Sequence, residues 1–176
     1  IFFRSVTNIM SDLTVEELEP FFCTWAPSPD HKWASLAPVM EIAGAPWFVR
    51  VMFGGISCTL QILRAAEGST SATDGVTVQT VTRMKVREER YEKMDGTRYA
   101  PSGYGANATQ SSIFKRTDEG VALEATMENP DKATRTTTTR TLLAGGLLKE
   151  VNFSEKTDGS DRSATVTRHF KKQASS

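Results

Sequence analysis

The sequence predicts a mainly β protein: an up-and-down antiparallel barrel of about ten strands with a helix-turn-helix lid after the first strand. Turn signals such as Asp-Gly and Gly-Gly recur about every 8 to 14 residues over most of the chain. The segments between them alternate apolar and polar residues, as strands with one buried face do. One helical insert stands near the start, and no βαβ alternation follows, which argues against a nucleotide-binding parallel sheet.

The first elements follow from local signals. The capping-box sequence that begins at Thr14 predicts a short helix running toward Pro20. The aromatic segment 21–25 then opens the first strand. Apolar residues between positions 32 and 50 fall at helical spacing, and two prolines divide them into two short helices with a break at Gly44.

The remainder of the chain reads as a series of strands. We expect them at 56–63, 76–81, 84–94, 112–116, 121–127, 134–143, 147–155 and 164–170. The segment 100–109 is rich in Gly, Ser and Asn and predicts a loop or a weak edge strand. We therefore divide the chain into an N-terminal extension (1–13), a barrel domain (14–173) and a tail (174–176).

The last strand carries the clearest functional signal. Ala164, Val166, Arg168 and Phe170 share one face of it, because alternate side chains of a strand point to opposite sides. An arginine on this apolar face is costly unless an anion meets its guanidinium. An internal cavity that holds a carboxylate ligand would supply the anion, and the alternative is a buried carboxylate of the protein or ordered water.

Composition excludes several classes of function. The chain has 176 residues, with 21 basic and 21 acidic residues mixed along it, so it has no electrostatic footprint for nucleic acid or an anionic membrane. No segment has the roughly 18 apolar residues of a membrane span. Cys23 and Cys58 are too few for a disulfide framework, and we expect buried thiols in a reducing, cytoplasmic compartment.

No catalytic or metal-binding pattern is found in the sequence. His31 and His169 have no Cys, Asp or Glu neighbours at ligand spacing. Gly103-Tyr104-Gly105 lacks the strand-to-helix context that a phosphate loop needs. We expect a protein without metal or cofactor that is not an enzyme. An enzyme on a related barrel is the weakest alternative.

Four stretches, in this order, match one known pattern. Phe21–Trp25 is similar to Phe-x-Gly-Thr-Trp, with cysteine in the glycine place, and Ile42–Arg50 is similar to a helix-turn-helix segment. Arg140–Leu147 is similar to Arg-Glu-Leu-x-Asp-Gly-Lys-Leu, and Thr167–Lys172 to Thr-Arg-x-Tyr-Glu-Lys. Together they resemble the intracellular fatty-acid-binding proteins, relatives of the lipocalins.

The resemblance implies a carrier of a fatty acid or similar hydrophobic carboxylate. In that family two inward arginines and a tyrosine hold the ligand carboxylate, and the matching residues here are Arg140, Arg168 and Phe170. Phenylalanine lacks the hydroxyl donor, so a bound carboxylate would lose one charge-assisted hydrogen bond of about 1.5–3 kcal/mol. The neighbours of Arg140 on its own face of the strand are threonines. This pattern is equally typical of a solvated barrel interior and of an exposed strand.

Two further interpretations remain open. Trp47, Phe48 and Phe53 would line a portal for ligand entry, the alternative being ordinary packing. The other function hypothesis is a diverged barrel that serves as a structural or interaction subunit and has lost ligand binding. In that case the N-terminal segment 1–10 is the expected docking arm for a protein partner.

Overall fold

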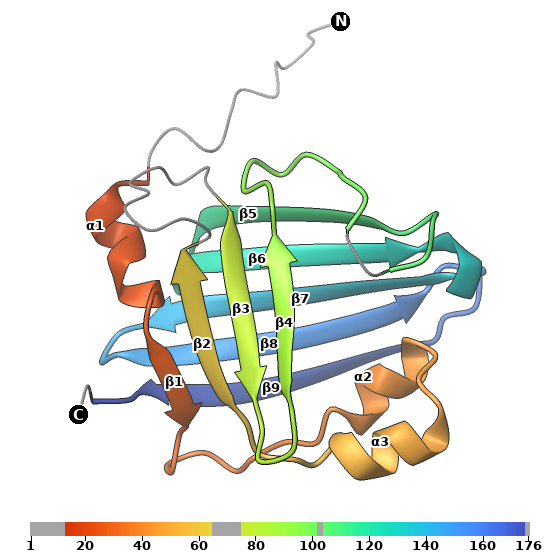
Figure 1. The fold of residues 1–176 in the computed structure, drawn as a ribbon, viewed down its shortest axis with the longest axis horizontal. Coiled ribbons are helices and arrows are strands. Elements are labelled where there is room, and N and C mark those ends of the chain that lie inside the picture. The colour runs from red at the N-terminus through yellow and green to blue at the C-terminus, as the bar shows by residue number, and fades with distance from the viewer. Residues whose placement is uncertain (1–12, 65–74, 102–103, 175–176) are drawn as a thin grey trace, which may run out of the picture.

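One antiparallel sheet forms the body of the molecule. The computed structural model describes residues 13–64, 75–101 and 104–174. Over these residues nine strands pair in the order β4-β3-β2-β1-β9-β8-β7-β6-β5. Their bounds are β1 Thr24–Pro27, β2 Thr59–Arg64, β3 Val76–Val81, β4 Val86–Tyr91, β5 Thr109–Thr117, β6 Gly120–Asn129, β7 Thr134–Leu143, β8 Leu147–Lys156 and β9 Ser163–Lys172. In Figure 1, β2–β4 cross in front of β5–β9, and the sheet wraps around a common interior. The predicted up-and-down barrel is confirmed.

The barrel has one weak seam, between β4 and β5. Among the described residues, the strand pairing between the segment after β4 and β5 consists of two isolated bridges, Asp95↔Ile113 and Tyr99↔Gln110. Asp95 accepts the backbone N–H of Thr97 at 2.9 Å, and Gly96 between them has φ of 77°. This tight turn interrupts the extended backbone that a tenth strand would need. The described residues therefore contain nine strands, where the sequence predicted about ten.

The chain enters the barrel through a short helical segment. α1 (Val15–Leu18) begins at the predicted capping box, in which Thr14 and Glu17 exchange side-chain and backbone hydrogen bonds. A 3-10 turn, η1 (Glu19–Phe21), follows, so β1 begins three residues later than the aromatic segment suggested. Phe21 is used instead as a core residue, and its ring contacts that of Phe114 with centroids 5.2 Å apart.

Two helices cover one end of the barrel. α2 (Ala37–Ile42) and α3 (Trp47–Phe53) are separated at Gly44, whose φ is 80°. The predicted division into two short helices is confirmed, although residues 32–36 are not helical. α2 lies against β8 and β9 (Figure 1). No helix among the described residues has the length and apolar character needed to cross a bilayer.

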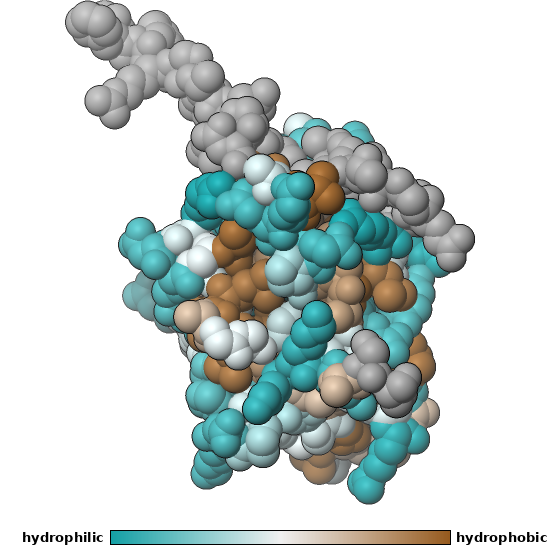
Figure 2. All heavy atoms as spheres, turned by 90° about the vertical axis from the view of Figure 1, so that its left-hand side faces the viewer, coloured by the Kyte–Doolittle hydropathy of each residue, from teal (hydrophilic) through white to brown (hydrophobic). Residues whose placement is uncertain are grey.

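The interior contains a hydrophobic core with residues from both halves of the sheet. Its buried members are Leu18, Phe21, Trp25, Cys58, Leu60, Ile62, Val76, Val78, Tyr91, Met94, Phe114, Leu123, Ala125, Leu148 and Phe170. In the end view of Figure 2, which faces the α1 side, apolar residues gather between hydrophilic ones. On β9, Val166, Arg168 and Phe170 are buried, so the inward face predicted from alternation is the observed one.

Candidate functional site

Three charged residues lie side by side on adjacent strands and face the interior. Arg140 of β7 is paired with Glu150 of β8, and Glu150 is paired with Arg168 of β9. Arg140 is 3% exposed, Glu150 is 1% exposed and Arg168 is 5% exposed. Since side chains directly opposite on antiparallel strands lie about 5 Å apart, the sheet register alone brings these charges into contact.

Glu150 binds both arginines at once. Arg140 donates its Nε–H to Glu150 Oε2 at 2.9 Å. Arg168 donates to Glu150 Oε1 from Nε at 3.1 Å and from Nη2 at 2.5 Å. Asn152 adds an N–H bond to Oε1 at 2.9 Å. Both carboxylate oxygens are therefore occupied by donors from the protein itself, a pairing that charge-assisted hydrogen bonds make strong.

These hydrogen-bond donors keep Glu150 ionised, although the residue is buried. Burial by itself raises the pKa of a carboxyl group, because it penalises the charged form. The charges of Arg140 and Arg168 and the hydrogen bonds from Arg168 and Asn152 outweigh that effect and lower the pKa of Glu150 to about 2. The carboxylate is thus a permanent counterion of the two arginines at neutral pH.

Arg140 has a second set of partners on the opposite half of the barrel. Its Nη1 donates to the Tyr91 hydroxyl at 2.9 Å, and its Nη2 lies 3.7 Å from Glu89 Oε2. The Tyr91 hydroxyl in turn donates to Glu89 at 2.9 Å. Burial raises the pKa of Tyr91, so the phenol is protonated and serves as this donor. These bonds join β4 to β7 across the interior.

Arg168 is enclosed by aromatic rings and a thiol. Its guanidinium lies 4.7 Å from the centroid of the Trp33 ring and 5.5 Å from that of Phe170. Its Nη1 lies 3.8 Å from Cys58 Sγ, and burial raises the pKa of that thiol. The Trp33 indole N–H is buried and has no hydrogen-bond partner among the described residues. Cation–π contacts of this kind contribute about 0.5–2 kcal/mol each.

Some inward-facing side chains beyond this cluster are not fully buried. Thr136, Thr138 and Asn152 share the inward face of Arg140 and Glu150 but keep part of their surface accessible. Thr138 donates to Asn152 Oδ1 at 3.1 Å. On β4, Arg87 has the same parity as the buried Tyr91, yet 61% of its side chain is exposed. Solvent therefore reaches this part of the inner face of the sheet.

The structure places the residues predicted from the sequence in two groups. Arg140, Arg168 and the fully buried Phe170 lie in the interior. Trp47, Phe48 and Phe53 lie on α3, which has no buried residue, and are 68%, 53% and 37% exposed.

A buried carboxylate was one of the partners expected for Arg168, but no pattern in the strand itself singled out Glu150. The turn at residues 144–146 offered a usable signal. Counting outward from that turn puts Leu143 opposite Leu147, and therefore Arg140 opposite Glu150. Tyr91 and Trp33 were missed as site residues because their contacts cross the barrel, and no local pattern reports such contacts.

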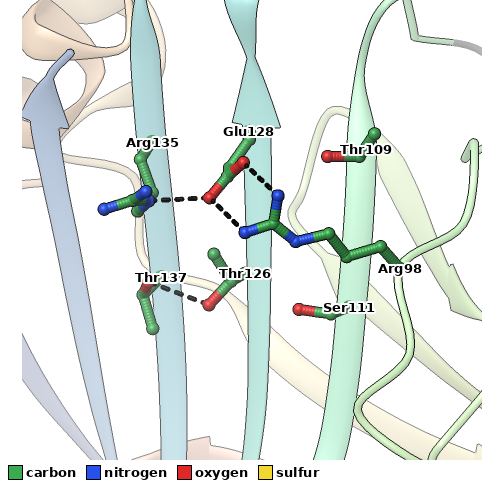
Figure 3. A pocket seen from close by; sticks show the side chains of 7 residues that line it. All are labelled: Arg98, Thr109, Ser111, Thr126, Glu128, Arg135 and Thr137. Atoms are coloured by element: carbon green, nitrogen blue, oxygen red, sulfur yellow. Dashed lines mark hydrogen bonds and ion pairs between the residues drawn. The ribbon is translucent and has the colours of Figure 1, made fainter.

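Two hollows lie on the outer face of the sheet and do not include this cluster. One, of about 310 Å³, lies over β5–β7. Figure 3 shows Glu128 in it between Arg98 and Arg135, with Thr126 and Thr137 hydrogen-bonded to each other. The other, of about 400 Å³, lies over β2–β4. In the first hollow the charged residues pair with one another, so each charge has a partner without a ligand.

The described residues contain no group of three or more His, Cys, Asp or Glu side chains placed to hold a metal ion. His31 and His169 stack on each other with ring centroids 4.0 Å apart, on the outer side of β9. In the cluster described above, the Glu150 carboxylate and the guanidinium groups of Arg140 and Arg168 are paired with one another.

Comparison with known proteins identifies the fold. No family model and no curated protein sequence matches the chain. Similar solved structures include lipid binding protein 8 of Caenorhabditis elegans, with 15% identity over 89% of this chain and 97% of that one, and a TM-score of 0.59. A fatty acid-binding protein from Drosophila melanogaster brain tissue has 17% identity over 85% and 98%, and a TM-score of 0.56.

A third similar structure is a secretory abundant heat soluble protein of Ramazzottius varieornatus, with 13% identity over 88% of this chain and 96% of that one, and a TM-score of 0.59. At such identities the likeness concerns the fold. The expected resemblance is confirmed at this level: the chain has the calycin barrel fold of the intracellular fatty-acid-binding proteins.

Proposed function

We propose that the chain binds one small hydrophobic carboxylate, such as a fatty acid or a retinoid, inside the barrel and acts as its carrier. The observation that carries this proposal is the accessible surface on part of the inner face of the barrel. Inward-facing side chains such as Thr138 and Arg87 retain accessible surface, whereas those of the hydrophobic core do not. Burial of an acyl chain in such a space would contribute about 0.8 kcal/mol per methylene group.

The fold supports the same proposal. A barrel of eight strands is just wide enough to be filled by its own side chains or to hold one small ligand, and the diameter grows with strand number. Over the described residues this barrel has nine strands and a weak seam between β4 and β5. In this proposal Arg140, Arg168 and Phe170 form the inner wall of the ligand space, and Trp47, Phe48 and Phe53 lie along its entrance at α3.

The proposed location is the cytoplasm. Cys23 and Cys58 are both free thiols, as expected in a reducing compartment. Labelling of accessible and total thiols in protein purified from its native source tests this point. Recovery of an oxidised cysteine would contradict the cytoplasmic location.

A pair of adjacent substitutions tests ligand binding inside the barrel. Thr138 points inward, and its neighbour Thr139 points outward toward Glu124. Thr138→Phe fills the proposed ligand space, so we expect it to weaken binding of hexadecanoic acid at least tenfold, about 1.4 kcal/mol. Thr139→Phe adds the same ring outside the barrel and should leave binding unchanged. The measurement is a calorimetric titration of delipidated protein.

The outcomes separate the two function hypotheses. Equal affinity of the two variants would contradict a ligand site inside the barrel. Absence of binding by folded wild-type protein to hexadecanoic acid, retinoic acid and retinol would contradict the carrier function altogether.

The interaction-subunit hypothesis has one observation in its favour. Trp47, Val51 and Met52 are 68%, 72% and 53% exposed on α3, and exposed apolar patches often mark protein interfaces. If this hypothesis holds, Trp47→Ser combined with Val51→Ser will abolish partner capture. In a carrier, the same variant should keep the affinity for hexadecanoic acid and change the rate of binding instead.

A further inference from the structure

The ligand's acidic head needs a cation that the protein has not already neutralised. Arg140 and Arg168 share Glu150, whose two oxygens accept hydrogen bonds from both of them. A ligand carboxylate brought to this pair would lie beside the Glu150 carboxylate, and like charges repel strongly in a buried site. The deep arginine pair is therefore a poor anchor for an anion in this chain.

A third inward-facing arginine is available nearer the edge of the sheet. Arg87 lies four residues before Tyr91 on β4, on the same face of the strand. Its side chain is 61% exposed, against 4% for that of Arg140 and 5% for that of Arg168. A ligand can therefore reach the Arg87 guanidinium without displacing a buried ion pair.

Two polar groups hold Arg87 in place. Its Nη2 lies 3.4 Å from Glu89 Oε1 and donates to the Tyr104 hydroxyl at 3.2 Å. Glu89 raises the pKa of Arg87, and the guanidinium is charged at neutral pH. Tyr104 belongs to the segment that leads into β5 and is 42% exposed. The Arg87–Tyr104 bond therefore joins β4 to the β5 side, across the seam of the barrel.

The ion-pair network of the inner face carries one net positive charge. It consists of three arginines, namely Arg87, Arg140 and Arg168, and two carboxylates, namely Glu89 and Glu150. Glu89 is shared between Arg87 and Arg140, while Glu150 is shared between Arg140 and Arg168. A ligand with a single negative charge would bring this set to neutrality.

We propose that Arg87, assisted by the Tyr104 hydroxyl, is the residue that binds the carboxylate of a hydrophobic acid in this barrel. The Arg140–Glu150–Arg168 cluster is then a closed ion-pair network in the wall of the ligand space rather than the head-group site. This inference rests on the proposed function, because it requires that the barrel takes up a hydrophobic carboxylate.

The experiment compares two ligands that differ only in the head group. Retinoic acid and retinol are titrated into delipidated wild-type protein and into Arg87→Gln, with quenching of tryptophan fluorescence as the readout. We expect Arg87→Gln to weaken retinoic acid binding at least tenfold and to change retinol binding less than threefold. Because a structural defect would weaken both ligands, the ratio of the two affinities isolates the contact with the carboxylate.

A matched control variant lies on the same strand. Arg90 points outward, is 72% exposed and pairs with Glu88, so Arg90→Gln removes the same charge outside the barrel. It should leave both affinities unchanged. Tyr104→Phe removes only the hydroxyl, and we expect a loss of roughly threefold to tenfold for retinoic acid alone.

Three results would count against the proposal. An unchanged ratio of affinities in Arg87→Gln overturns the role of Arg87 and leaves the carrier function intact. If Arg90→Gln changes the ratio of the two affinities as much as Arg87→Gln does, the effect comes from the overall charge of the protein. This result would also overturn the role of Arg87. Failure of the folded wild-type protein to bind retinoic acid, retinol and hexadecanoic acid alike overturns the carrier function and the inference together.

Discussion

At the residue scale, Glu150 determines what the two interior arginines can do. An interior arginine needs an anion, and a ligand or the protein can provide it. Here the protein provides it, through a carboxylate that is 1% exposed and that binds Arg140 and Arg168 together. The arginine positions alone therefore do not identify a carboxylate-binding site. The accessible Arg87 is a better candidate for that contact.

Removal of the Glu150 carboxylate should destabilise the folded protein. Glu150→Ala leaves two buried guanidinium groups without their counterion, and we expect it to lower the free energy of unfolding by about 3–5 kcal/mol. Glu155→Ala, on the same strand, removes a partner of Arg135 that is 31% exposed and should cost at most about 1 kcal/mol. Urea denaturation measures both values. Similar costs for the two variants would show that the interior network does not depend on Glu150.

At the scale of single elements, hairpin turns decide which side chains meet. The turn at residues 144–146 sets the register that places Arg140 opposite Glu150. A slip of β8 by one residue against β7 would turn Glu150 toward solvent and leave Arg140 inside without it, since the side-chain period of a strand is two. The β5–β6 turn requires glycine at position 120, because Gly120 has φ of 145° and lies close to the backbone of Leu142.

Gly120→Ala tests this turn. An added Cβ would lie 2.2 Å from the Leu142 carbonyl oxygen, so the backbone must shift. We expect the free energy of unfolding to fall by about 1–3 kcal/mol, as overpacking usually costs. At Gly55 the added Cβ meets nothing within 4 Å, and Gly55→Ala should stay within about 0.5 kcal/mol of the wild type. Thermal or urea unfolding that ranks the two variants equally would contradict the close contact.

At the scale of the whole molecule, the barrel is strongest on one side and weakest at its seam. β6, β7, β8 and β9 are joined by long continuous ladders. Between β4 and β5 the backbone pairing of the described residues is limited to the two isolated bridges. Local opening requires less free energy where fewer hydrogen bonds and contacts must break. The seam should therefore open well before the sheet of β6–β9 does.

Hydrogen exchange measures this difference directly. We expect the backbone amides of β7 and β8 to exchange slowest, near the rate set by global unfolding, and those of β4 to exchange fastest among the strands. Bound ligand should slow exchange at β4 more than at β8 if its head group contacts Arg87. Equal protection of β4 and β8 in the free protein would contradict the weak seam.

The sequence by itself determined the strand series, the capping box at Thr14, the break at Gly44 and the inward face of β9, because each is a local pattern of periodicity or turn chemistry. It also identified Arg168 as an interior residue whose charge needs a partner, and the family resemblance added Arg140. Only the tertiary structure decided that this partner is Glu150, and that Arg87 faces the interior with an accessible guanidinium. Contacts across strands depend on register and closure of the whole barrel, which bring together residues far apart in the chain.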